Sequence, residues 1–136
     1  MAYNLVVPVT EQEDLGSGYF RIRLAAPDIA AEARPGQFLM LGLPDIDVML
    51  VRRPFSVARV FPDPGRGRPE AIDVLYKVYG KRTLAFSHLR PGSRMSVLGP
   101  LGRGFWIPDG LDEAELFLVA GGIGSAPFPL LLQHLP

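Results

Sequence analysis

The chain has 136 residues, enough for one ordinary hydrophobic core, and 48% of them are hydrophobic. Its fourteen Lys and Arg balance fourteen Asp and Glu, so no overall field favours nucleic acid or an anionic membrane surface. The absence of cysteine excludes disulfides and cysteine-ligated zinc or iron–sulfur clusters within these residues. No run approaches the roughly 18 apolar residues of a membrane-spanning helix, and the start has no signal-peptide character, so we expect a cytoplasmic protein.

Six short segments have the character of β-strands. Phe20, Ile22 and Leu24 alternate with Arg21 and Arg23, which is the period-two pattern of a strand with one buried face. Glycine and proline turns separate the segments, and the 15 Gly and 14 Pro favour short strands of the kind found in barrels. The expected strands cover residues 5–9, 19–26, 37–43, 54–61, 71–79 and 94–98, and six strands fit a small closed sheet.

Two helices and one further strand are expected outside this sheet. Thr83 can cap a short helix within residues 81–89. Residues 116–120 are continuously apolar, as in a parallel strand buried on both faces, and a glycine turn and a helix over residues 128–135 follow. We expect these last segments to lack covering layers within the 136 residues. We expect dimerisation, local disorder or a tail folded back on the barrel.

The segment from Arg53 to Ser56 carries three complementary groups. Arg53 is a bidentate donor that suits a diphosphate, Phe55 offers a face to a flat ring, and Ser56 offers a hydroxyl. In an extended strand Arg53 and Phe55 share a face while Ser56 points to the other, so one ligand meets all three only at a twisted or bulged edge. Taken alone, the segment is more simply interpreted as an exposed arginine beside a proline-started edge strand.

Two glycine positions follow strands and precede helices. At Gly80 the free amides of a helix start favour an anion, so a phosphate could dock between Gly80 and Thr83. A glycine hinge with a threonine cap explains the same residues equally well. Gly121 to Gly124 occupy the place where a pyrophosphate binds in open α/β sheets, with a simple packing turn as the alternative.

The order of these elements resembles the ferredoxin–NADP reductase superfamily. The resemblance rests on the segments from Arg53 to Val57, from Leu75 to Thr83 and from Val97 to Phe105, followed by the glycine turn. Within the superfamily, the sequences of these segments are most similar to those of the electron-transfer subunits of NAD-dependent dihydroorotate dehydrogenases. Phe55 stands where many members have tyrosine, and Ile123 where many have threonine.

The resemblance implies a mainly β fold: a six-stranded antiparallel Greek-key barrel with one short helix, then the first strand and helix of a truncated α/β nucleotide-binding domain. Residues 1–110 would bind FAD, and residues 111–136 would begin the NAD-binding domain. The site residues implied for FAD are Arg53, Pro54, Phe55, Ser56, Leu75, Tyr76, Lys77, Gly80 and Thr83, and those implied for NAD(H) are Gly121, Gly122 and Gly124.

The function implied is an oxidoreductase that passes electrons from NADH through FAD to an iron–sulfur cluster outside this chain. The partner would be the catalytic subunit of a dihydroorotate dehydrogenase, in pyrimidine biosynthesis. A flavin reductase or another NAD(P)H:acceptor reductase is the alternative within enzymes. A non-catalytic β-barrel module that stacks nucleotides on Phe20, Phe38 and Phe55 is the alternative from another class.

No residue is predicted to act as a catalytic acid, base or nucleophile, and no metal site is predicted. His88 and His134 are far apart in sequence, and neither has a carboxylate or cysteine pattern beside it. Roles on a helix surface or in packing are therefore the simpler interpretation of both histidines.

Overall fold

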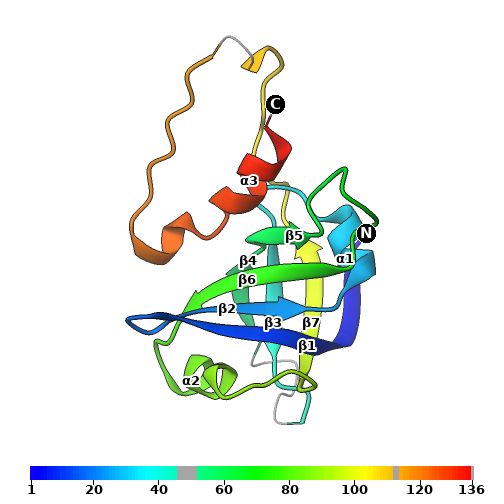
Figure 1. Cartoon of the computed structure of the whole chain (residues 1–136), viewed down its shortest axis with the longest axis vertical. Helices are drawn as coiled ribbons and strands as arrows, with labels where there is room; N and C mark the ends of the chain where they lie inside the picture. Colours follow the sequence, from blue (N-terminus) through cyan, green and yellow to red (C-terminus); the bar gives the residue numbers. More distant parts are fainter. Residues whose placement is uncertain (46–51, 112–113, 136) are drawn as a thin grey trace.

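A computed structural model describes residues 1–45, 52–111 and 114–135. Within these residues seven strands form one antiparallel sheet that curls into a barrel (Figure 1). They are β1 (Tyr3–Gly16), β2 (Tyr19–Leu24), β3 (Phe38–Gly42), β4 (Arg53–Ser56), β5 (Arg59–Phe61), β6 (Ala71–Lys77) and β7 (Arg94–Leu101). The expectation of a mainly β, antiparallel fold is confirmed.

The strand expected over residues 54–61 is divided into β4 and β5 by a bend at Val57 and Ala58. The sheet order is β4-β3-β7-β1-β2-β6-β5, so β4 and β5 lie at opposite edges. At the bend, the Val57 amide donates to the Gln37 carbonyl beside β3 (3.0 Å) and the Ala58 amide donates to the Asp73 carbonyl of β6 (2.9 Å). One continuous segment therefore joins both edges and closes six strand positions into a barrel.

The hairpin of β1 and β2 supplies much of the core. Ile22 and Leu24 are fully buried, and Arg21 and Arg23 lie on the other face, as the alternation predicts. β1 is longer than the expected five residues, because it continues past Val9 and pairs with β2 along most of that strand. The longer hairpin leaves room beyond the core for polar pairing on its outer face.

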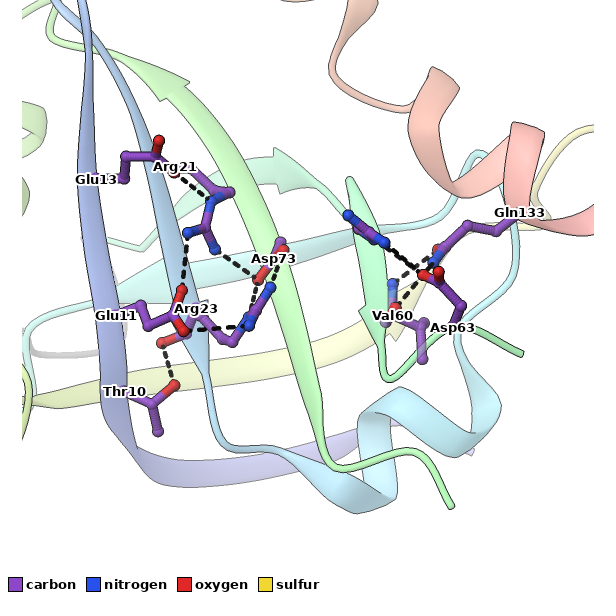
Figure 2. Close-up of polar contacts among 10 residues, drawn as sticks. Thr10, Glu11, Glu13, Arg21, Arg23, Val60, Asp63, Asp73 and Gln133 are labelled. Carbon is purple, nitrogen blue, oxygen red and sulfur yellow. Dashed lines mark hydrogen bonds and ion pairs between the residues drawn. The ribbon is translucent and has the colours of Figure 1, made fainter. Parts of the chain in front are cut away.

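A network of arginines and carboxylates lies on that outer face (Figure 2). The Asp73 carboxylate, 1% exposed, accepts hydrogen bonds from Arg23 Nε (2.7 Å) and Nη2 (2.9 Å). Arg21 donates to Glu11 (2.8 Å) and Glu13 (3.0 Å). Because a buried carboxylate is costly unless it is paired, the network ties β1, β2 and β6 together at fixed register.

Three α-helices are found in the described ranges: α1 (Pro27–Glu32), α2 (Lys81–Ser87) and α3 (Phe128–His134), with a 3₁₀ turn, η3 (Gly122–Ser125), before the last. α1 is not expected from the sequence. Its signals are Pro27 in the first turn and the acidic Asp28 beside it, but six residues are too few for a periodic pattern. None of the helices that the structure describes is long and apolar enough to cross a membrane.

The strand expected at residues 116–120 is not formed, and this part of the prediction is wrong. Phe117 is 80% exposed and Val119 is 90% exposed, rather than buried on both faces. A parallel strand needs a neighbouring strand to pair with, and the described part of the chain offers none there. After β7 the chain leaves the barrel and returns to it at α3 (Figure 1).

The expected helix is formed as α3, and it packs against the barrel. Leu130 is fully buried in the barrel's core cluster. The Gln133 side-chain amide accepts from the Val60 amide (3.0 Å) and donates to the Val60 carbonyl (2.9 Å), as a neighbouring strand would. It also donates to Asp63 (2.6 Å; Figure 2). Of the three outcomes expected for the tail, the structure shows the one in which it folds back.

Asp63 gives the docking of α3 a predicted dependence on pH. Hydrogen bonds from Arg59, and then from Gln133, hold the pKa of the Asp63 carboxyl below its ordinary value of 3.8. A carboxyl whose pKa is lowered on folding stabilises the folded state above its ordinary pKa and loses that contribution as the pH falls through the folded value. Hydrogen exchange of residues 128–134, corrected for intrinsic rates, should therefore accelerate below about pH 4. In Asp63→Asn, hydrogen exchange of residues 128–134 should be faster than in the wild type at pH 7 and should change little on acidification. The same pH dependence of exchange in both proteins would contradict this role of Asp63.

Candidate functional site

A cleft of about 840 Å³ lies between β4, the end of β6, the start of α2 and η3. This volume is in the range of sites for small molecules and cofactors. Ten of the twelve residues predicted from the sequence line it: Arg53, Pro54, Phe55, Ser56, Leu75, Tyr76, Lys77, Gly80, Thr83 and Gly122. Segments that are distant in sequence therefore meet at one place, although a binding role for each residue stays a prediction.

β4 presents its residues to the cleft from the edge of the sheet. Arg53 pairs with Leu41 and Phe55 with Leu39, and both leucines are buried, so Arg53 and Phe55 share the inward face. Ser56 lies on the other face by alternation. All three still line one cleft, because β4 is an edge strand and the chain bends immediately after Ser56. The bent edge that these three residues require is present.

Aromatic rings back the cleft behind Phe55. The Phe55 ring lies 5.7 Å from that of Phe86 and 6.3 Å from that of Tyr76, between ring centroids. Tyr76 is 1% exposed, and its hydroxyl donates to the Gln12 amide oxygen (3.1 Å). Burial raises the pKa of Tyr76 to about 12, so this phenol stays neutral at physiological pH. Packing on these rings holds Phe55 in place.

The end of β6 alternates in its exposure to the cleft. Leu75 is half-buried and Lys77 exposed, while the Tyr76 side chain between them turns into the core. Tyr76 can therefore offer a ligand its backbone rather than its ring. Lys77 is the cross-strand partner of Tyr19, and its Nζ lies 5.1 Å from the centre of the Tyr19 ring.

The start of α2 differs in detail from the expected cap. Gly80 is the N-cap, and Thr83 is the third residue of the helix. Thr83 Oγ1 accepts hydrogen bonds from the amides of Tyr79 (2.7 Å) and Gly80 (3.2 Å), so it ties down the turn from inside the helix. Gly80 is extended, and a Cβ placed there would meet no protein atom within 4 Å. The space beside Gly80 is open to the cleft.

The charge of the lining is strongly one-sided. Four cationic side chains contribute to the lining, Arg53, Lys77, Lys81 and Arg82, and no carboxylate is among the described lining residues. Because the whole chain has a formal net charge of zero, this positive charge is a local excess. Arg53 is exposed, and its guanidinium has no hydrogen-bond or ion-pair partner among the described residues. Such a lining favours an anionic ligand.

The glycine turn contributes to the same cleft only in part. Gly122 lines it and adopts φ +53°, with the Tyr19 hydroxyl close to the position of an added Cβ (3.5 Å). Gly121 and Gly124 are not among the described lining residues. The turn is folded as η3 and forms one wall, so the region predicted to begin the NAD(H) site lies beside the residues predicted for FAD.

Several lining residues escape the sequence interpretation. Tyr19 stands across the sheet from Lys77, a relation that only the register of β2 and β6 reveals. Tyr79, two residues after the end of β6, is 90% exposed and lines the cleft. Its position next to Gly80 was the only feature of the sequence that could have indicated a place in the site. Ile123 and Ala126 line the cleft because the tail folds back, which local sequence does not encode.

Among the described residues, no group of three or more His, Asp or Glu side chains could hold a metal ion. His134 Nδ1 lies 2.9 Å from the Leu130 carbonyl within α3, and His88 ends α2. The Phe20 ring stacks on that of Tyr76 (5.6 Å between centroids), and Phe55 packs on Phe86, so two of the three rings considered for nucleotide stacking are engaged within the barrel.

Curated relatives share the sequence across most of this chain. The chain is 41% identical over 111 residues to the dihydroorotate dehydrogenase B (NAD(+)) electron transfer subunit of Desulforamulus reducens, covering 81% of this chain and 39% of the relative. It is 35% identical over 127 residues to the protein of the same name from Streptococcus pneumoniae R6, covering 93% and 47%. The chain thus spans less than half the length of these relatives.

Solved structures share the fold. The CS-b5R domains of human Ncb5or in the NAD+ form match with a TM-score of 0.76 and 25% identity, over 98% of this chain and 39% of that one. Amycolatopsis cytochrome P450 reductase GcoB matches with a TM-score of 0.73 and 26% identity, over 98% and 40%.

The family model described as an oxidoreductase FAD-binding domain matches residues 7–106, which include most of the barrel and most of the cleft. The match agrees with the cationic cleft and its aromatic backing. This chain belongs to the family of oxidoreductase FAD-binding domains.

Proposed function

We propose that the cleft holds FAD and that the chain is the flavin-binding part of an NADH-dependent electron-transfer protein. The observation that carries this is the local excess of four cationic residues in a cleft lining that also includes Phe55, in a chain of this family. A diphosphate needs the cations, and a flat heterocycle needs an apolar wall.

In this arrangement each segment of the cleft has a distinct task. Arg53 and the turn from Gly80 to Thr83 hold the diphosphate, with Lys81 adding positive charge. Phe55 and Pro54 support the flavin side of the ligand, Ser56 offers it a hydroxyl, and Leu75 and Lys77 flank its edge. Tyr79, which is 90% exposed, offers a ring on which adenine can stack. Bound FAD supplies the conversion between two-electron hydride transfer and single-electron transfer.

The NADH side of the proposal rests on the tail. Gly122 forms part of the cleft wall, and Gly121 and Gly124 are in the same turn. A dinucleotide bound at this turn would lie next to the flavin, which hydride transfer requires. NAD(H) is the substrate we assign to the whole protein, and residues 111–136 the start of the domain that binds it.

For the whole protein we propose the role named for its relatives, electron transfer in dihydroorotate oxidation. The identities of 41% and 35% support it. The partner is then the catalytic subunit of a dihydroorotate dehydrogenase. Electrons would reach it through an iron–sulfur cluster outside this chain, since the chain has no cysteine. Because NADH is kept inside the cell, the proposal places the protein in the cytoplasm.

A stand-alone NAD(P)H:acceptor reductase is the second candidate. The similarity to a cytochrome P450 reductase, at a TM-score of 0.73, supports it, because the fold serves different acceptors. The sequence identities to the dihydroorotate dehydrogenase subunits are higher, and they favour the first candidate.

Two substitutions of one residue test the FAD site. Gly80→Asn and Gly80→Asp both place a side chain of one size in the open space, and both residues are good N-caps, so α2 should be kept. They differ in charge. We expect wild-type chain to bind one FAD in a fluorescence titration, Gly80→Asn to bind it more weakly, and Gly80→Asp to bind it about tenfold more weakly than Gly80→Asn, because its carboxylate repels the diphosphate.

Thermal unfolding followed by circular dichroism is the control, and the two variants should unfold at the same temperature. Equal FAD affinity in the two variants would place the diphosphate away from Gly80. Failure of the wild-type chain to bind FAD would overturn the proposed site altogether.

A further inference from the structure

Arg52, the residue before β4, binds two other strands of the barrel. Its Nε and Nη2 donate to Ser96 Oγ (3.1 and 2.7 Å), and Nη2 also donates to Asn4 Oδ1 (2.7 Å). Ser96 is on β7 and Asn4 on β1, and β3 lies between β4 and β7 in the sheet. The Arg52 side chain therefore reaches across one whole strand to make these contacts.

Glycine at one position of β3 gives the side chain its route. Gly42 pairs with Ser96, and it is the β3 residue that follows Leu41, the partner of Arg53. With no side chain at this position, Gly42 leaves space on β3 for the Arg52 side chain to cross to Ser96. Gly42 is buried although it is on the outer face, which agrees with its being covered.

Arg52 and Arg53 point to opposite faces of the sheet. Arg53 shares the inward face with Phe55, toward the cleft, and Arg52 is fixed on the outward face with Ser96. Neighbouring residues of an extended chain alternate in this way. The two arginines therefore have separate tasks, and only Arg53 is placed to contact a ligand.

β4 is a short strand at the edge of the sheet. It has four residues and begins at Arg53, and its second residue, Pro54, has no amide hydrogen to donate to β3. The first residue of a short edge strand frays easily. The Arg52 guanidinium fastens the backbone immediately before Arg53 to β7 and β1.

We propose that Arg52 is a positioning residue for phosphate recognition. It fixes the start of β4 through Ser96 and Asn4, so that the Arg53 guanidinium is held over the cleft where the diphosphate binds. This inference rests on the proposed function, because it assumes that Arg53 binds the diphosphate of FAD.

Affinities for FAD and for riboflavin, which has no phosphate, test it in six proteins: wild type, Arg53→Met, Arg52→Met, Arg52→Lys, Ser96→Ala and the double variant Arg52→Met/Ser96→Ala. We expect Arg52→Met to weaken FAD binding about three- to tenfold and to leave riboflavin binding unchanged. Ser96→Ala should give a smaller loss of the same kind, and the double variant should be no worse than Arg52→Met. Arg52→Lys should restore binding only in part, because an ammonium cannot reproduce the fork on Ser96 and Asn4.

The outcomes separate the two proposals. If Arg53→Met weakens FAD and riboflavin equally, the proposed diphosphate site is wrong. If Arg53→Met selectively weakens FAD but Arg52→Met and Ser96→Ala do not, or if these two weaken both ligands equally, the positioning role is overturned. Ser96→Ala removes one hydroxyl from the outer face, so it keeps the test decisive if Arg52→Met does not fold.

Discussion

Replacing Arg53 by methionine should weaken FAD binding by about 10- to 100-fold, the largest functional loss expected from one side chain of this chain. A hydrogen-bonded contact with a charged group contributes about 1.5 to 3 kcal/mol, which corresponds to that range in Kd. The change should leave stability nearly unaltered, because Arg53 is exposed and has no partner among the described residues.

The control is Arg68→Met, in the exposed loop between β5 and β6. It removes the same charge from an exposed residue that does not line the cleft. Fluorescence titrations at two salt concentrations compare the proteins, and Arg53→Met should also flatten the salt dependence. An equal loss of FAD affinity in both variants would mean that only the overall charge of the chain matters.

Gly104→Ala should produce a large loss of stability. Gly104 has φ +80°, and a Cβ there would lie 2.6 Å from the Pro35 carbonyl oxygen. That oxygen accepts a hydrogen bond from the Phe105 amide (2.7 Å), so it cannot move away without breaking the contact. The left-handed backbone costs alanine about 1–2 kcal/mol, and the overlap adds about 1–3 kcal/mol.

Gly92→Ala is the matched control, because Gly92 has φ +92° and no atom within 4 Å of an added Cβ. It should show the backbone contribution alone. Urea unfolding of both variants measures the difference. Equal losses would show that the segment at Gly104 yields easily, and that its contact with Pro35 does not fasten the chain after β7.

The alternation of Ile22 and Leu24 with the arginines was enough to predict β2, because period two and a single buried face are local properties. The bend at Val57 was not predictable in this way. Residues on both sides of it have strand character, and only their partners on β3 and β6 decide where the strand divides. The prediction of a strand at residues 116–120 was wrong for a related reason, since a buried strand depends on neighbouring strands that the local sequence does not supply.

The residues of the cleft also differ in how far the sequence predicts their place. Arg53, Phe55 and Gly80 could be placed together because their chemistry is unusual in a strand and turn, and because a family pattern gave their order. Tyr76 is among the residues that line the cleft, but its ring is buried in the core, so its predicted binding role stays a prediction. Gln133 was not recognised, because a glutamine that imitates a strand has no sequence signature until β5 lies beside it.

The bend between β4 and β5 lies between two features of the molecule, the cleft and the contacts that hold α3 against the barrel. Ser56 lines the cleft, and Arg59, three residues later, donates to Asp63 (2.6 Å), which also receives Gln133 of α3. Hydrogen bonds of Arg59 and Gln133 to Asp63 therefore connect α3 to the segment that follows Phe55 and Ser56. If a ligand in the cleft favours the docked position of α3, then docking of α3 strengthens binding of that ligand by the same free energy. The bend that closes the barrel therefore lies, along the chain, between the cleft and the residues that dock α3.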